Sequence, residues 1–391
     1  MELFKREDIR SIIEKYLDSD PAQLALKLNV ERDVREAVCT QIKMLKRAAE
    51  KLPSLYEARC WLPQRAFEQS TSEAVANVKF SCSGKLAFDL TCGLGIDSLS
   101  LSHRYERVIS IEPDSELAEV VKNNMQQLGV NNVEVISTTA EEFLENWSGE
   151  NPDLIYLDPD RRDGAGKKVV VFEDCSPNVI ELLPRMLSLS QKVVIKCSPL
   201  FDVDQVFAMF GARASVEIVS YRGECKELLI TLRKDDVVSE DILTAIVIGK
   251  DNTTRIGTAN RLPLGVRPEW KNDYNYLFVP DVALCRAKLL RMIFPLDAYI
   301  VSENGYVFAN EIPEHFCGHY FEILSISNYR PKEIVTLLRN ENISRATIMQ
   351  RDFDKLNSDI AKELKIKEGG SRKLAFTTIE GVRKMILLKQ D

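Results

Sequence analysis

The chain has 391 residues, of which 45% are hydrophobic and 28% charged, a composition typical of a protein with two or three domains and a buried core. Its formal net charge of −7 argues against a protein that coats nucleic acid non-specifically. It has no apolar run of about 18 residues, no signal-peptide layout in MELFKREDIR, and nine cysteines without a C-x-x-C pair. A cytoplasmic protein with reduced thiols and no membrane association is therefore expected.

Residues 1–78 are expected to form helices, because apolar residues recur every three or four positions in REDIRSIIEKYL, VREAVCTQIKMLKRAAEKL and TSEAVANVKF. Residues 79–235 alternate short apolar runs with helical stretches. The predicted strands are KLAFDL, RVISIEP, VEVIST, DLIYLDP and KVVIKCSP, and the helices are IDSLSLSHR, SELAEVVKNNMQQLG, AEEFLENW and NVIELLPRMLSL. This series predicts an α/β fold with a doubly wound, mostly parallel sheet. The run SVEIVSYRGECKELLITLRK predicts an antiparallel hairpin at the sheet edge.

The polar stretch RKDDVVSED predicts a domain boundary near residue 236. Residues 236–318 are expected to hold a linker and a small α+β domain, and residues 319–391 a βαβα unit with a terminal pair of strands. Residues 320–391 carry 14 Lys and Arg against 10 Asp and Glu, a net charge of +4. The remainder carries 38 against 49, a net charge of −11, which suggests separate tasks for the two parts.

The stretch LAFDLTCGLGIDSL carries the strongest chemical signal. Gly93 and Gly95 predict a tight loop that a ligand can approach closely, and Asp97 is expected to cap the following helix. A dinucleotide site is the main alternative, but it requires G-x-G-x-x-G and a pyrophosphate at the helix start. Here Ser98 occupies the third glycine position, and acids on both sides of the loop would repel pyrophosphate. They suit an ammonium or sulfonium group, so the loop favours S-adenosylmethionine over NAD.

The motif D-x-T-C-G-x-G-x-D resembles motif I of the class I S-adenosylmethionine-dependent methyltransferases, whose fold is Rossmann-like. The resemblance implies a loop that cradles the amino-acid end of the cofactor, with contacts from Asp89, Thr91, Gly93, Gly95 and Asp97. Glu112 follows about 20 residues later, where an acid binds the ribose hydroxyls, with Pro113 beside it. After the third strand the usual acid is displaced or absent, so Ala140 and Glu141 are the candidates for adenine contact.

The fourth strand ends in LDPDRRD, although a purely structural strand end would be Gly, Asn or Ser. Asp158 and Pro159 resemble the start of the D/N-P-P-Y/F motif of enzymes that methylate nitrogens. The resemblance implies that the Asp158 carboxylate and the Pro159 carbonyl accept hydrogen bonds from the target nitrogen. Arg161 stands in the place of the aromatic residue, and it and Arg162 are candidates to hold the base or phosphate of the substrate. The alternative is that Asp-Pro-Asp is only a turn.

Other segments belong to the same end of the sheet by topology. Similar Gln/Thr stretches of nucleic-acid methyltransferases cover the cofactor carboxylate, so Gln69 and Thr71 are candidate cofactor contacts; a helix cap by Thr71 or Ser72 is the alternative. Lys196, at the end of the fifth strand, is either a contact for substrate phosphate or a surface lysine.

Two further motifs are not assigned to chemistry. HFCGH lacks a fourth ligand for zinc, and Cys92 lacks a nearby His base, so neither a metal site nor a cysteine nucleophile is predicted.

The last 70 or so residues resemble the THUMP-like domain, a relative of the RNA-binding THUMP module of tRNA-modifying enzymes, and residues 276–318 resemble the ferredoxin-like unit that often accompanies it. With DP-x-RR in the core, the chain resembles the bacterial THUMP-like methyltransferase family. The resemblance implies an RNA substrate, tRNA or rRNA. The candidate phosphate contacts are Arg330, Lys332, Arg345, Arg351, Arg372 and Lys373. The alternative is that these residues are solvated surface charges.

The sequence therefore predicts direct transfer of a methyl group from S-adenosylmethionine to a nitrogen of RNA, with most of the rate supplied by proximity and orientation. A protein or small-molecule methyltransferase is one alternative. A cofactor-binding and RNA-binding protein without turnover is another, because the D-P-P-Y motif is incomplete. The oligomeric state is not predicted.

Overall fold

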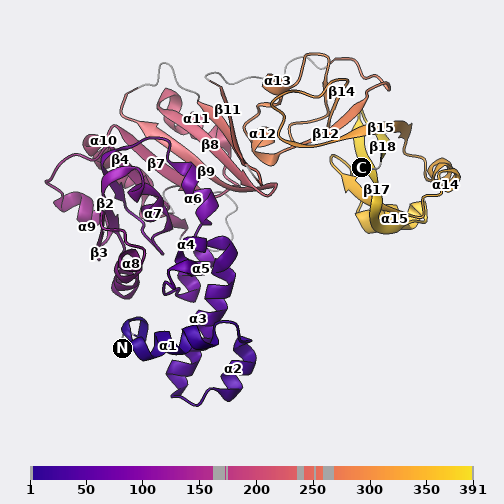
Figure 1. Ribbon diagram of the computed structural model, residues 1–391. Coiled ribbons are helices and arrows are strands. Elements are labelled where there is room, and N and C mark those ends of the chain that lie inside the picture. The colour runs from indigo at the N-terminus through magenta and orange to yellow at the C-terminus, as the bar shows by residue number, and fades with distance from the viewer. Residues whose placement is uncertain are drawn as a thin grey trace. The chain divides into compact units, whose positions relative to one another are not determined.

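The computed structural model describes residues 3–161, 172, 175–235, 242–250, 252–258 and 268–389 (Figure 1). The N-terminal segment is helical, as predicted. Its elements are η1 (Leu3–Lys5), α1 (Glu7–Tyr16), α2 (Pro21–Lys27), α3 (Arg32–Lys51), α4 (Pro53–Glu57), α5 (Gln64–Gln69) and α6 (Glu73–Lys79). The longest helix, α3, buries one face that includes Val34, Val38, Ile42 and Leu45, the spacing expected of an amphipathic helix.

A parallel sheet follows the N-terminal segment. Its strands are β1 (Gly84–Asp89), β2 (Tyr105–Ile111), β3 (Val133–Ile136), β4 (Leu154–Leu157), β7 (Lys192–Cys197) and β9 (Glu224–Arg233), in the order β9-β7-β4-β1-β2-β3. All neighbours pair in parallel except β9, which runs antiparallel to β7. The helices between the strands are α7 (Ile96–Ser102), α8 (Ser115–Gln127), α9 (Ala140–Asn146), α10 (Val179–Leu189) and α11 (Val203–Phe210). The predicted doubly wound α/β sheet is confirmed.

The last two residues of β1 show how the sheet is packed. Successive side chains of a strand point to opposite faces. Phe88 packs edge-on against Phe143 of α9, with ring centroids 5.0 Å apart. The Asp89 carboxylate accepts a hydrogen bond from the Ser98 hydroxyl of α7 at 2.6 Å. Helices therefore cover both faces of β1, as a doubly wound sheet requires.

The N-terminal segment packs on α8 rather than standing apart from the sheet. The Asn124 side chain pairs with the backbone of Trp61 through two hydrogen bonds of 2.9 Å, one donated and one accepted. One apolar cluster joins Ile42 and Leu45 of α3 to Val121 and Met125 of α8. These contacts hold α5 and α6 beside the loop that follows β1.

A buried ionic network joins the last helix of this segment to the sheet. The Lys79 ammonium, at the end of α6, lies 2.8 Å from the Asp97 carboxylate of α7 and 3.1 Å from the Glu227 carboxylate of β9. The Tyr156 hydroxyl of β4 donates to Asp97 at 2.8 Å. The Lys79 side chain is 0% exposed, and that of Glu227 is 2% exposed. A buried ammonium needs its carboxylates, so these elements are fixed relative to one another.

The remaining strands and helices form a second unit. β8 (Ala214–Tyr221) pairs in parallel with β10 (Leu243–Ile248), which pairs antiparallel with β11 (Thr253–Thr258). A sheet of order β13-β14-β12-β15-β18-β17-β16 follows. Its elements are β12 (Tyr276–Pro280), α12 (Val282–Arg286), α13 (Leu290–Ile293), β13 (Tyr299–Ile300), β14 (Val307–Ala309), β15 (Gly318–Asn328), α14 (Pro331–Asn340), β16 (Arg345–Gln350), α15 (Asn357–Leu364), β17 (Lys367–Ile379) and β18 (Val382–Leu388).

The second unit corrects one expectation and leaves another open. β8 was expected at a sheet edge, but β10 and β11 extend the pairing beyond it. The chain divides into Met1–Ser215 with Glu227–Val238, and Val216–Lys226 with Ser239–Asp391. The boundary predicted near residue 236 lies outside the described residues, and the division into four domains stays a prediction. In the described part of the chain, no helix is long and apolar enough to cross a membrane.

Replacing Lys79 by Met is expected to lower the free energy of unfolding by roughly 3–5 kcal/mol, because it leaves Asp97 and Glu227 buried without their cation. Urea unfolding followed by circular dichroism measures the change. Lys85→Met, which removes an exposed lysine from β1, is the matched control and should change stability little. The double variant Lys79→Met/Glu227→Gln should be more stable than Lys79→Met. Equal stability of Lys79→Met and Lys85→Met would contradict this account.

Candidate functional site

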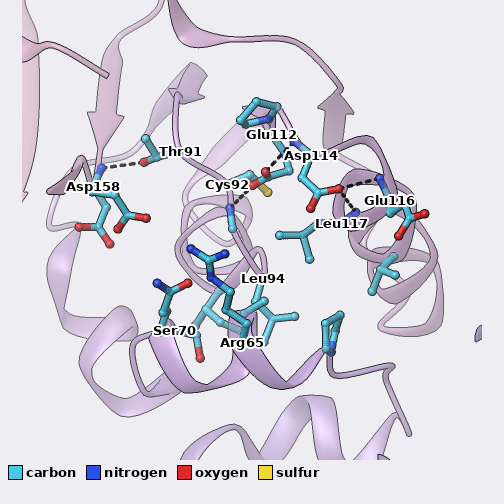
Figure 2. Close-up of a pocket in the computed structure, with 18 of the residues that line it drawn as sticks. Arg65, Ser70, Thr91, Cys92, Leu94, Glu112, Asp114, Glu116, Leu117 and Asp158 are labelled. Atoms are coloured by element: carbon cyan, nitrogen blue, oxygen red, sulfur yellow. Dashed lines mark hydrogen bonds between the residues drawn. The ribbon is translucent and has the colours of Figure 1, made fainter. Parts of the chain in front are cut away.

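A cavity of about 1140 Å³ opens at the carboxyl ends of β1, β2, β3 and β4 (Figure 2). On the sheet side it is lined by the loop after β1, the start of α8, the start of α9 and the end of β4. On the opposite side it is lined by η1 and by residues of the N-terminal segment between Trp61 and Thr71. The carboxyl ends of parallel strands are where open α/β sheets bind ligands. The volume is slightly above the usual range for small-molecule pockets, about 300–1,000 Å³.

The glycine loop after β1 is tied to the end of β2. The Gly93 N–H donates to the Glu112 carboxylate at 2.9 Å, and the Asp114 N–H donates to the other oxygen of the same carboxylate at 3.0 Å. Burial raises the pKa of Glu112, and these two donors oppose the rise. Gly93 has φ of +54°, and a Cβ there would meet nothing within 4 Å. Its backbone therefore borders open space, as expected for a loop that a ligand approaches.

Gly95 packs against α8 in this structure, and its predicted contact with the cofactor stays a prediction. Its φ is +82°, and a Cβ would lie 2.8 Å from Val121 and 2.9 Å from Met125 of α8. It allows close packing of the loop on α8, and among the described residues it is not part of the cavity wall.

Asp89 lies beneath the cavity rather than in its wall. It is 0% exposed, and besides the Ser98 hydroxyl it accepts the Thr91 N–H at 3.1 Å. Ser98 in turn accepts from the Ser110 hydroxyl at 2.9 Å. Burial raises the pKa of Asp89 to about 7. The predicted role of Asp89 as a cofactor contact stays a prediction; in this structure it shapes the loop from below.

Two predicted helix caps are wrong. Asp97 does not cap α7; its carboxylate is taken by Lys79 and Tyr156, and the capping position is Gly95. Burial works against ionisation of Asp97, but the ammonium groups of Lys79 and Lys196 outweigh it and hold the pKa of Asp97 below its ordinary value. At the start of α6, Ser72 makes no side-chain cap. Instead, the Thr71 hydroxyl lies 3.4 Å from the Glu227 carboxylate, so it joins the same buried network.

Asp158 and Lys196 form an ion pair at the ends of β4 and β7. The Asp158 N–H also donates to the Thr91 hydroxyl at 2.6 Å, which joins the end of β4 to the glycine loop. Burial disfavours the charged form of Lys196, but the carboxylates of Asp158 and Glu227 outweigh it and raise its pKa. Lys196 is therefore not a free surface lysine: it holds the Asp158 carboxylate, and its contact with a substrate phosphate stays a prediction.

The other predicted residues are distributed as follows. The cavity wall contains Gln69, Thr71, Thr91, Gly93, Asp97, Glu112, Pro113, Ala140, Glu141 and Asp158. Pro159 lies between two wall residues, Asp158 and Asp160. The backbone of Arg161 pairs with Cys175 in the short ladder of β5 (Asp160–Arg161) and β6 (Cys175–Ser176), and Arg162 lies outside the described residues. Arg330 is paired with Glu333 at 3.0 Å, and Lys332 lies in the first turn of α14.

The charge of the cavity wall discriminates between ligands. Eight of its described residues are acids, namely Asp97, Glu112, Asp114, Glu116, Glu119, Glu141, Asp158 and Asp160, and Arg65 is the one basic residue among them. Such a wall repels a pyrophosphate and attracts cationic groups. S-adenosylmethionine carries a sulfonium and an ammonium, so the donor set and the open backbone at Gly93 fit this cofactor and disfavour NAD.

Sequence reasoning missed Arg65 and Lys79, and it gave Glu227 only a structural place on the predicted hairpin, without its partner Lys79. Arg65 was detectable, because it lies four residues before Gln69 and so on the same face of α5. Lys79 and Glu227 carried no local signal, since they meet from elements almost 150 residues apart. Of the two unassigned motifs, Cys92 is buried, and burial raises its pKa. In the described part of the chain, no three His, Cys, Asp or Glu side chains are grouped as metal ligands.

Comparison with known proteins agrees with this geometry. A family model described as "THUMP domain-like" matches residues 318–390, and one described as "Conserved hypothetical protein 95" matches residues 74–173. A crystal structure of a candidate methyltransferase from Porphyromonas gingivalis superposes with a TM-score of 0.80 at 22% identity. It covers 100% of this chain and 98% of that one.

Curated relatives are similar over part of the chain. A 23S rRNA (uracil(1939)-C(5))-methyltransferase of Vibrio parahaemolyticus is 26% identical over 167 residues, 40% of this chain and 38% of the relative. An uncharacterised RNA methyltransferase of Oceanobacillus iheyensis is 31% identical, over 24% and 23% of the two chains. A tRNA/tmRNA (uracil-C(5))-methyltransferase of Photorhabdus laumondii is 27% identical, over 33% and 41%. The chain thus spans less than half the length of each.

Replacing Asp89 by Asn is expected to change how stability depends on pH. With a pKa of about 7, native Asp89 keeps its proton while the unfolded chain releases it near pH 4. Wild-type stability therefore falls between about pH 4 and pH 7, by up to about 4 kcal/mol from this group. Asn carries no such proton, so the difference in unfolding free energy should move in favour of Asp89→Asn across that range. Parallel curves in urea titrations at several pH values would contradict it.

Three findings indicate the same fold: the strand order around β1, the glycine loop tied to Glu112, and the superposed crystal structure. The chain has the fold of the class I S-adenosylmethionine-dependent methyltransferases and carries a THUMP-like domain at residues 318–390.

Proposed function

We propose that the protein is an S-adenosylmethionine-dependent methyltransferase whose acceptor is a base of RNA. The observation that carries the proposal is the acidic cavity at the carboxyl ends of the parallel strands, in which the bare backbone of Gly93 and the carboxylates of Glu112 and Asp158 face one space. An acidic wall attracts a cationic ligand, and the glycine loop, which has no side chain at Gly93, lets the ligand approach the main chain closely.

The residues that would hold the cofactor are those of the wall nearest the sheet. Glu112 has one oxygen bonded to Gly93 and the other to Asp114, and each oxygen keeps a second lone pair for a hydroxyl. Gln69 reaches the same cavity from α5, and Ala140 and Glu141 border it beyond β3. When bound, S-adenosylmethionine supplies an electrophilic methyl group on a sulfonium.

Asp158 is the group proposed to orient the acceptor. Its carboxylate is one-third exposed, so one edge remains open to the cavity while Lys196 contacts the other. Pairing with an ammonium fixes the direction of the carboxylate. A carboxylate held in this way accepts a hydrogen bond from the acceptor and holds it for attack. The Pro159 carbonyl is proposed to act beside it.

Support for RNA comes from outside the cavity. The match of residues 318–390 to a THUMP domain-like model and the similarity to RNA methyltransferases both favour an RNA substrate. The acidic wall itself repels phosphate, so an acceptor base has to enter it while the backbone of the RNA is bound elsewhere. Arg330, Lys332 and Arg162 remain proposed contacts for that backbone.

The comparisons do not support a nitrogen as the methylated atom. Two of the relatives are named as uracil C5 methyltransferases, and C5 is a carbon, so these names give no support to a nitrogen acceptor. The proposal is therefore methylation of an RNA base, with nitrogen and carbon products separated by experiment.

Asp158→Ala is expected to lower the rate of methyl transfer to RNA by about 10²-fold or more while cofactor binding is retained, since it removes the group that orients the acceptor. The assay measures radiolabelled methyl groups in unmodified tRNA and rRNA transcripts and in protein. Chromatography of the digested RNA then separates N-methylated from C5-methylated nucleosides. Asp235→Ala, which removes an exposed aspartate outside the cavity wall, is the control.

Label in RNA that survives Asp158→Ala would remove this residue from the acceptor site. Label in protein alone would indicate a polypeptide substrate. Cofactor binding without label in any RNA or protein would favour a binding protein without turnover, the reading suggested by the incomplete D-P-P-Y motif.

A further inference from the structure

Arg65 is the one basic residue among the described residues of the cavity wall. It lies on α5, on the side of the cavity opposite the strand ends, and Figure 2 shows its guanidinium directed into the space below Cys92. Other arginines of the N-terminal segment are paired: Arg47 lies 3.1 Å from Glu68, and Arg59 lies 3.0 Å from Glu14. Arg65 has no hydrogen-bond or ion-pair partner within the described ranges of the chain, although eight acids line the same cavity.

The ligand proposed for this cavity is a zwitterion with an excess of positive charge. Its sulfonium and ammonium are matched by the carboxylates at the strand ends, but it also carries a carboxylate. Three of the eight acids, Asp97, Glu119 and Asp158, are paired with lysines, but a carboxylate placed beside the remaining acids is still disfavoured unless a cation faces it. A guanidinium offers two parallel N–H donors to a carboxylate, an arrangement stronger than a neutral hydrogen bond.

The cavity is polarised in the way such a ligand requires. The acids come from the strand-end loops, from β5 and from α7, α8 and α9, whereas the cation comes from α5. Gln69, one turn after Arg65 on the same face of α5, adds an amide that donates hydrogen bonds beside it. A zwitterion that lies across this cavity is therefore bound in one orientation, with its carboxylate toward α5.

We propose that Arg65 binds the carboxylate of S-adenosylmethionine and thereby selects the intact amino-acid end of the cofactor. This inference rests on the proposed function. It gives the N-terminal segment a direct part in cofactor recognition. The opposing assignment, Arg65 as a contact for RNA phosphate, makes a different prediction for cofactor analogues.

The test compares two ligands that differ in one group, S-adenosylmethionine and decarboxylated S-adenosylmethionine, by calorimetric titration of the full chain. The quantity measured is the ratio of the two dissociation constants. Arg65→Ala should weaken binding of S-adenosylmethionine roughly tenfold to a hundredfold and leave the decarboxylated ligand unchanged, the range expected for a charge-assisted pair. Arg65→Lys should retain part of the preference. Arg47→Ala, which removes a paired arginine outside the cavity wall, should change neither constant.

Equal weakening of both ligands by Arg65→Ala would overturn the proposal, because it would indicate a general effect on the cavity. No weakening of either ligand, with loss of RNA binding, would assign Arg65 to phosphate instead. If the wild-type chain binds neither ligand, the proposed function falls together with this inference, and that result is distinct from the other two.

Discussion

The ammonium of Lys79 in the core of the first unit is the interaction on which the site depends. Its two carboxylate partners, Asp97 and Glu227, come from the helix after the glycine loop and from the antiparallel strand β9. Tyr156 joins β4 to the same network. Breaking one partner of a buried ion pair is far more costly than losing a surface pair, so these elements cannot shift independently. The N-terminal segment, which ends in Lys79, is therefore part of the cavity rather than an appendage to the sheet.

The second constraint is the division of charge around the cavity. Beneath it, Asp89 is held with a raised pKa, whereas Glu112 and Asp158 face the open space. The backbone N–H groups that bond Glu112 and the ammonium that contacts Asp158 fix the direction of each carboxylate. An acidic wall suits a cationic cofactor and repels the phosphates of a nucleic acid. This separation is consistent with a chain in which cofactor binding and RNA binding are assigned to different parts.

Local sequence patterns predicted most of the elements of the first unit but not the contacts between them. The alternation of KLAFDL, RVISIEP and DLIYLDP with helical runs predicted the sheet, because side-chain periodicity is a local property. The β10–β11 pair was not foreseen, since TAIVIGKD and the residues after it gave no clear period. Asp97 was predicted to cap a helix because the local sequence does not show its buried partner, Lys79, which lies in another helix. Lys196 was predicted to be a phosphate contact or a surface lysine for the same reason, because the carboxylate that it contacts is 38 positions away.

The central claim is that the cavity beside Gly93 binds S-adenosylmethionine. Titration of the cofactor into the wild-type chain, Gly93→Ala and Gly129→Ala tests it most directly. Both glycines have positive φ, and a Cβ at either meets nothing within 4 Å, but only Gly93 of the two borders the cavity in the described structure. The account predicts one site in the wild type, binding weakened about tenfold or more by Gly93→Ala, and unchanged affinity in Gly129→Ala. No binding to the wild type, or equal affinity of the two variants, would contradict it.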